Sequence, residues 1–193
     1  TSFDVITILN VINELEKEDL EDLLLNFDTL LADDGVLIIL EPALKFSTRK
    51  LMDFRNKILE KYQYKISYPC FHDKECPMLS CKNDWCHGEL QGLDSRLVNM
   101  LDGITGFNKH KIKYSCAVFY KNKKEKFVSY EDYARVVSVP KLSNRGLSFT
   151  ACALDCYKEI LISKDELKKN KDLKKLRLLD KFNIKEKFQL YLK

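Results

Sequence analysis

The chain has 193 residues, of which 45% are hydrophobic and 32% charged, with a formal net charge of +4. This balance supplies enough apolar surface for one packed core with a small appendage and excludes a mainly disordered chain. No apolar run approaches the roughly 20 residues of a membrane-spanning helix, and the N-terminus lacks the basic and apolar regions of a signal peptide, so we expect neither.

The first third of the chain predicts alternating strands and helices. The expected elements are a strand at 3–12, a helix from Lys17 to Leu31, a strand at 36–42 and a helix at 47–62 with Ser47 as its N-cap. Both strands are nearly continuous apolar runs, which is typical of strands covered on both faces. Asp33-Asp34-Gly35 ends the first helix. This order indicates an α/β fold with a parallel sheet.

The rest of the chain predicts further strands on either side of a long loop region. We expect a strand at 114–120, at an edge of the sheet, and short β-strands at 134–139, 147–153 and 159–162. Asn144-Arg145-Gly146 gives the clearest turn signal. The short strands predict a small β appendage, followed by a basic helix or coil.

Four of the seven cysteines lie close together, in the segment from Cys70 to Cys86. The odd number of cysteines and the absence of an Asn-x-Ser/Thr sequence argue against a secreted disulfide scaffold, so we expect a reducing compartment. In such a compartment, clustered thiolates are available to a soft metal. Cys116 lies inside an apolar run and is predicted to belong to the core.

Charge is distributed unevenly along the chain. Residues 1–44 contain eleven acidic residues and one basic residue, whereas residues 164–193 contain eleven basic and five acidic residues. The basic part favours a polyanion such as RNA, because each neutralised phosphate releases counterions. A solvated helical surface explains the tail equally well, since its lysines alternate with leucines at helical spacing.

Three stretches near the N-terminus resemble the second half of the sheet of a class I S-adenosylmethionine-dependent methyltransferase. They are Phe3-Asp4-Val5-Ile6, Asn13-Glu14-Leu15 and the run from Asp34 to Pro42. The pattern Pro-Cys-x-His-Asp-x-x-Cys-Pro at 69–77, followed by Trp85-Cys86-His87, is more specific. It resembles the methyltransferase-like family of the mitochondrial small ribosomal subunit, which also has bacterial members.

The resemblance covers nearly the whole chain. The later segments that agree in order are Ala134-Arg135-Val136-Val137, Arg145-Gly146, Cys152 and Ser163-Lys164. In that family, three proximal cysteines and one distal cysteine hold a [4Fe-4S] cluster. Carried over to this chain, the resemblance implies the ligands Cys70, Cys76, Cys86 and Cys152.

The cysteines themselves leave the metal open. Four thiolates suit an iron–sulfur cluster or tetrahedral zinc. Zinc sites generally pair cysteines about two to four residues apart, whereas gaps of five, four and four residues separate the proximal cysteines here, which fits a larger cluster better. Cys81 and Cys156 are further thiols, and they leave the ligand set open.

Two histidines flank the proximal cysteines. A zinc site would recruit His72 or His87 as a ligand, whereas beside a cluster we expect them to contact the loop backbone or the ligand sulfurs. Trp85 could stack on RNA, but beside a cluster it is expected to shield the site from solvent.

The residues do not identify a methyl-donor site. A donor lies over a glycine-rich turn after the first strand of such a fold, and none of the six glycines follows a predicted strand in a G-x-G pattern. Because the chain starts at Thr1, directly before a predicted strand, we expect the donor-binding half, where S-adenosylmethionine would bind, to lie upstream or to be missing altogether. No residue is identified as catalytic, so enzyme activity stays open.

Taken together, the sequence predicts an α/β fold, namely the second half of a Rossmann-like class I methyltransferase sheet with a cysteine-rich insertion and a small C-terminal β appendage. The expected domains are residues 1–66 with 107–130, residues 67–106 for the insertion and residues 131–193 for the appendage.

The resemblance implies an assembly and translation factor that binds the small ribosomal subunit and its ribosomal RNA. It is expected to be monomeric when free, in the mitochondrial matrix of eukaryotes or the cytoplasm of bacteria. The alternatives are an active RNA or protein methyltransferase, a zinc-stabilised RNA-binding module and a redox sensor.

Overall fold

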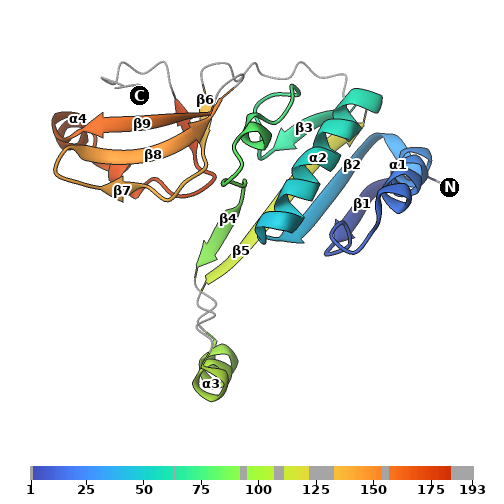
Figure 1. The fold of residues 1–193 in the computed structure, drawn as a ribbon, viewed down its shortest axis with the longest axis horizontal. Helices are drawn as coiled ribbons and strands as arrows, with labels where there is room; N and C mark the ends of the chain where they lie inside the picture. The colour runs from blue at the N-terminus through green and yellow to red at the C-terminus, as the bar shows by residue number, and fades with distance from the viewer. Residues whose placement is uncertain are drawn as a thin grey trace.

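Two β-sheets flank the cysteine-rich segment (Figure 1). The computed structural model describes residues 2–62, 64–91, 95–106, 111–121, 133–153 and 157–183. Within these ranges no helix is long and apolar enough to cross a membrane. Cys156 and the chain after Asn183 lie outside the described residues.

The first sheet is mixed. Its strands are β1 (Phe3–Leu9), β2 (Leu31–Pro42), β3 (Tyr64–Tyr68), β4 (Gly88–Gln91) and β5 (Lys111–Lys121). In the order β1-β2-β5-β3, β1 is parallel to β2, whereas β5 runs antiparallel to β2, β3 and β4. The prediction of parallel strands holds for β1 and β2. The 114–120 strand, expected at an edge of the sheet, instead lies between β2 and β3 and runs antiparallel to both, because β5 folds back on β4 and pairs on both of its sides.

Both long helices pack on one face of this sheet. They are α1 (Lys17–Leu30) and α2 (Lys45–Lys61). The buried residues that form this core include Leu20, Leu24, Phe27, Leu37, Ile39, Phe54, Ile58, Ala117 and Phe119. On the other face, Phe3, Val5 and Leu9 of β1 are 50%, 53% and 50% exposed. The expectation that β1 is covered on both faces is therefore wrong in the described chain.

The helix boundaries follow the predicted pattern closely. The first helix begins at Lys17 as predicted, with a capping box between Glu16 and Asp19, and ends at Leu30. The prediction that Asp33-Asp34-Gly35 ends it is wrong, because the chain is already extended at Leu31 and these residues lie in β2. The second helix begins before the predicted cap: Leu44 is its N-cap residue, and Ser47 lies buried inside the helix. Ser47 is not a cap, because the chain already turns into the helix directly after Pro42-Ala43.

The second sheet contains the predicted short strands. They are β6 (Tyr133–Val136), β7 (Lys141–Leu142), β8 (Gly146–Cys152), β9 (Tyr157–Ser163) and β10 (Lys181–Asn183). The order is β10-β6-β8-β7, and β9 also pairs with β8. The helix α4 (Lys164–Lys169) and the 3₁₀ helix η2 (Lys171–Lys175) follow β9, and Leu167 and Leu173 are buried in the core of this sheet. The predicted basic helix is therefore short and interrupted.

The helix α3 (Arg96–Thr105) stands clear of both sheets (Figure 1). Ser95 caps it and Gly106 ends it in the left-handed conformation, with φ of 70°. None of its residues is buried. This helix was not predicted, although Leu97, Met100, Leu101 and Ile104 follow helical spacing.

Candidate metal centre

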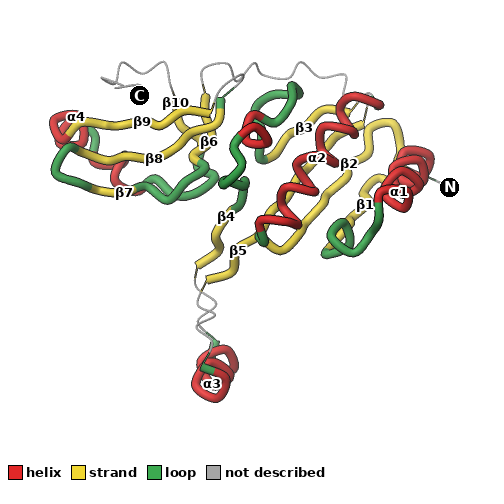
Figure 2. Tube along the Cα trace, viewed as in Figure 1, coloured by secondary structure: helices red, strands yellow, loops and turns green. Residues whose placement is uncertain are grey.

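The cysteine-rich segment leaves the first sheet at the end of β3 and returns to it as β4. Both of these strands pair with β5. Figure 2 shows that this segment is mostly loop. The strand β3 pairs with residues 118–121 of β5, and β4 pairs with residues 111–114. The stretch of β5 between them, Ser115 to Ala117, pairs with neither strand. It forms part of the wall of a cavity of about 40 Å³ instead.

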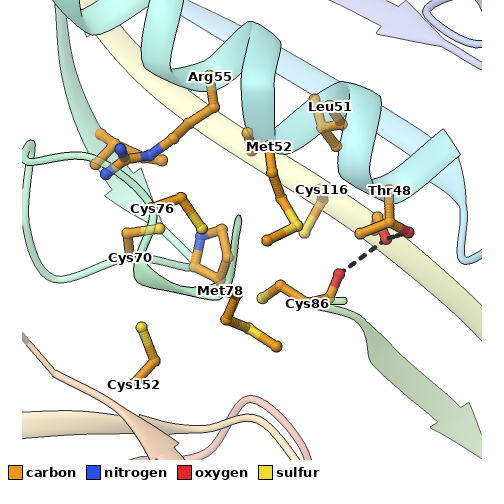
Figure 3. A pocket seen from close by; sticks show the side chains of 14 residues that line it. Thr48, Leu51, Met52, Arg55, Cys70, Cys76, Met78, Cys86, Cys116 and Cys152 are labelled. Atoms are coloured by element: carbon orange, nitrogen blue, oxygen red, sulfur yellow. Dashed lines mark hydrogen bonds between the residues drawn. The ribbon is translucent and has the colours of Figure 1, made fainter. Parts of the chain in front are cut away.

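Five cysteines line this cavity, together with mainly apolar side chains (Figure 3). They are Cys70, Cys76, Cys86, Cys116 and Cys152. The first three come from the segment between β3 and β4, and Cys152 comes from the end of β8 in the second sheet. The fold thus brings together all four cysteines that the resemblance implied as ligands.

The remaining thiols fall into different places. Cys116, predicted to be a core residue, is half-buried on β5 and lines the cavity. Cys81 is the described cysteine that stays outside the cavity wall. Cys156 lies outside the described residues. Among the residues that the structure describes, no three Cys, His, Asp or Glu meet the geometry of a single metal ion. The five thiols on the cavity wall therefore do not form such a group.

The surroundings of Cys76, Cys86 and Cys116 raise the pKa of each thiol and so favour its protonated form. Burial raises the pKa of Cys76 to about 11 and that of Cys116 to about 12, and the Cys70 thiol is the next cause in both. Burial also raises the pKa of Cys86 well above its usual range. Because a metal binds thiolates, loading this cavity would release protons.

Arg55 of α2 holds the first part of the cysteine-rich segment. Its side chain is 3% exposed and donates to the carbonyl of His72 at 2.6 Å and to that of Lys74. The neighbouring Asn56 accepts a hydrogen bond from the backbone N–H of Cys76 at 3.0 Å. Buried carbonyl groups need donors, so this helix fixes the backbone from His72 to Cys76.

Arg49, one turn and a half earlier on α2, holds the second part. Its guanidinium donates to the carbonyls of Met78, Leu79, Cys81 and Asp84 at 3.4, 2.8, 2.8 and 3.1 Å. A single fork of donors thus orders the turn that contains the 3₁₀ helix η1 (Pro77–Ser80). Sequence reasoning missed Arg49 and Arg55, because backbone carbonyl acceptors leave no pattern in the sequence.

The end of the segment is bound to the first sheet. The Ser115 hydroxyl donates to the carbonyl of Cys86 at 3.0 Å and lies 2.5 Å from the Thr48 hydroxyl. Trp85 donates through Nε1 to the carbonyl of Ala43 at 3.1 Å. Trp85 and Cys86 also pack against the buried cluster formed by Met52, Cys76, Met78 and Val137. The indole is therefore fixed beside the cysteine-rich segment, and its shielding of the site from solvent stays a prediction.

The second sheet is bound to the same segment by Arg135. Its Nε donates to the carbonyl of Pro69 at 2.7 Å, and its Nη1 donates to that of Leu179 at 2.6 Å. The guanidinium also lies 4.1 Å from the ring centre of Phe71 and 5.1 Å from that of Tyr68. These contacts hold β6, and with it the paired strand β8, next to Pro69, the residue before Cys70.

Residues 1–182 match the family model described as mitochondrial small ribosomal subunit Rsm22. The chain belongs to this family. No curated protein matches it. Membership of the Rsm22 family gives the chain a role related to the small ribosomal subunit and associates it with the mitochondrion in a eukaryote. The matched residues include the complete wall of the cavity.

Neither His72 nor His87 of this Rsm22-family chain lines the cavity, although both are described. Burial, followed by the charge of Arg55, lowers the pKa of His72 to about 4, so the imidazole is neutral. The Nδ1 atom of His87 lies 3.1 Å from the carbonyl oxygen of Trp85, and the two rings stack with centres 5.6 Å apart. His87 thus has the backbone contact that the sequence predicted.

The carboxyl ends of β1 and β2 meet at Glu41. This side chain is 1% exposed, and its Oε1 accepts hydrogen bonds from the N–H groups of Val11 and Ile12 at 2.9 and 2.7 Å. The carboxylate therefore holds the turn after β1 in place. Ligands of open α/β sheets collect at this end, and in the Rsm22-family chain Glu41 serves the backbone there.

Proposed function

We propose that the chain is an assembly and translation factor of the small ribosomal subunit that binds ribosomal RNA and carries a structural [4Fe-4S] cluster. Its proposed ligands are Cys70, Cys76, Cys86 and Cys152. The observation that carries the proposal is the convergence of these thiols, from two distant parts of a small-subunit family chain, on one cavity.

The cavity supports a cluster over a single zinc ion. The strongest donors on its wall are thiols, which suit either group. A volume of about 40 Å³ exceeds the roughly 15 Å³ that one water-sized body needs, so there is space for more than one atom. The wide spacing of the proximal cysteines supports the same choice, because zinc sites use closer pairs.

The proposed role of the cluster is structural. When bound, it would supply iron–thiolate bonds between the cysteine-rich segment and the end of β8. The chain's own residues prepare this connection, because Arg49 and Arg55 order the segment and Arg135 brings the second sheet to it. Metal loading and the docking of the two sheets are then coupled.

The order β1-α1-β2-α2-β3 supports the methyltransferase-like part of the proposal. Two consecutive β-α-β units with parallel strands are the building blocks of Rossmann-like sheets. We assign methyl-donor binding to none of the described residues, since Glu41, at the edge where ligands collect, is bound to its own backbone.

Part of the basic C-terminal segment neutralises itself. Lys168 pairs with Asp165, Lys169 with Glu166 and Lys175 with Asp172, at 2.9, 3.0 and 2.8 Å. These exposed pairs are of the helical type that contributes little to stability. They reduce the positive charge that α4 and η2 offer to RNA, so we place the proposed RNA contacts on other lysines.

The test is the metal content of the full chain purified without oxygen. About four irons and four sulfides per chain, with broad visible absorption, would support the cluster. A colourless protein with one zinc would move the proposal to a zinc-stabilised RNA-binding module. Cys152→Ser should lose both the iron and co-sedimentation with small subunits, and retained co-sedimentation would count against a structural role for the cluster.

A further inference from the structure

A groove of about 440 Å³ runs between the cysteine-rich segment and the second sheet. Asp84, Trp85 and His87 form one wall, with Lys113 of β5 beside them. The opposite wall belongs to the second sheet and includes residues of β7, β8 and β9. This volume lies within the range of about 300–1,000 Å³ that small-molecule sites occupy.

Two stacked rings form part of one wall of the groove. Trp85 and His87 lie at an interplanar angle of 25°. The indole is fixed by its hydrogen bond to Ala43, and the imidazole by its contact with the Trp85 carbonyl. A preformed aromatic pair beside an open volume suits a planar ring, because stacking then requires no rearrangement of the protein.

The charged residues of the groove suit a nucleotide better than a simple anion. Lys113 and Lys141 are exposed on opposite walls and can bind phosphate. Glu159 adds an acceptor of the kind that binds the exocyclic amino group of a base. Asp84 has its own partner, the Tyr157 hydroxyl. The groove thus contains lysines that can donate to phosphate and a carboxylate that can accept from a base, together with the aromatic pair.

We propose that this groove binds a nucleotide of single-stranded RNA, with the base against Trp85 and His87 and its phosphates on Lys113 and Lys141. Unpaired bases are the usual target of such aromatic platforms, because a base within a duplex does not expose its face. The inference rests on the proposed function and names the part of the ribosomal RNA that this surface takes, namely an unpaired segment.

The groove is built by the same contacts that build the cysteine site. His87 directly follows Cys86, and the β8 residues on the other wall precede Cys152. The groove therefore keeps its width only while these two parts of the chain stay together. This gives a physical reason why a structural cluster would be needed for RNA binding.

The test measures the affinity of the anaerobically purified full chain for a fluorescent 12-nucleotide single-stranded RNA of mixed sequence, by anisotropy at fixed salt. The groove variant is Lys113→Gln with Lys141→Gln. The control variant is Lys45→Gln with Lys158→Gln, which removes the same charge from exposed positions outside the groove. We expect the groove variant to bind at least about tenfold more weakly, and the control less than about threefold.

A second variant, His87→Ala, tests the stacking contact. We expect it to weaken binding about tenfold while keeping the iron content of the wild type; the exposed lysine variants serve if this change disturbs Cys86. Equal losses of RNA affinity in the groove and control variants, or no binding of the RNA by the wild type, would overturn the proposal that the groove binds RNA.

Co-sedimentation with small subunits separates the two proposals. A wild-type chain that binds subunits, with groove variants that bind them equally well, overturns the groove and leaves the proposed function standing. A wild-type chain that binds no subunits overturns the proposed function itself.

Discussion

Arg135 and Cys152 face each other as cross-strand partners in β6 and β8. The Arg135 side chain reaches from this pair to the carbonyl of Pro69, the residue before Cys70, at 2.7 Å. The distal cysteine therefore takes its position from the residue that also binds the start of the proximal segment. The two sheets meet at the cavity because of this relationship.

Replacing Arg135 by Gln should destabilise the protein by about 3 kcal/mol. The change removes two hydrogen bonds from a charged donor and the contact with two aromatic rings, and it leaves the carbonyls of Pro69 and Leu179 without their donor. Urea unfolding followed by circular dichroism measures the loss. Arg145→Gln, at an exposed turn, is the control and should change stability by less than about 0.5 kcal/mol. Equal stability of the two variants would contradict the role of Arg135.

Serine variants of the cysteines should divide into two groups. Each of Cys70→Ser, Cys76→Ser, Cys86→Ser and Cys152→Ser is expected to lose most of the iron, because each removes a proposed ligand. Cys81→Ser, outside the cavity wall, and Cys116→Ser should keep it. Iron analysis and visible absorption after anaerobic purification give the answer. A Cys116→Ser protein without iron, beside a Cys86→Ser protein that keeps it, would show that Cys116 is the ligand.

Arg49→Met should loosen the segment without unfolding the sheets. Four carbonyls between Met78 and Asp84 would lose their donor, so we expect amide hydrogen exchange in this region to accelerate about tenfold or more. Lys45→Met, at the exposed start of the same helix, is the matched control. Unchanged exchange in the Arg49 variant would mean that the cysteine-rich segment is held by other contacts.

Gly146→Ala should destabilise the second sheet by more than about 3 kcal/mol. Gly146 has φ of 142°, and a Cβ atom there would lie 1.9 Å from the carbonyl oxygen of Ile162 on β9. Gly103→Ala in α3 is the opposite case, because a Cβ atom there meets nothing within 4 Å and alanine favours a helix by about 1 kcal/mol. Thermal unfolding of both variants compares them directly. A Gly146→Ala protein as stable as Gly103→Ala would exclude the close approach of β8 and β9.

Local pattern was enough to find most of the fold. The run from Lys17 gave the first helix, and Asn144-Arg145-Gly146 gave the turn where the Ser143 N–H and the Gly146 N–H exchange hydrogen bonds with each other's carbonyls. Both depend on neighbours in sequence. The antiparallel direction of β5 depends on which strand it folds back on, and no local pattern contains that information.

The candidate site was predictable only in part. The resemblance supplied the association of Cys152 with the proximal cysteines, which the residues alone did not give. The position of Cys116 on the cavity wall was missed because its apolar neighbours predict an ordinary core strand. They do not indicate that this short stretch of β5 pairs with neither β3 nor β4. The supporting arginines were missed because their partners are carbonyl groups, which every residue has.

The contribution of β8 to the cavity wall has a consequence for synthesis. The proximal cysteines are synthesised well before Cys152, since Cys86, the last of them, precedes Cys152 by 66 positions. Until β8 emerges, the growing chain exposes the proximal thiols on an open surface. A prematurely terminated chain therefore never completes the thiol set, and the finished cavity marks a polypeptide whose translation has passed Cys152.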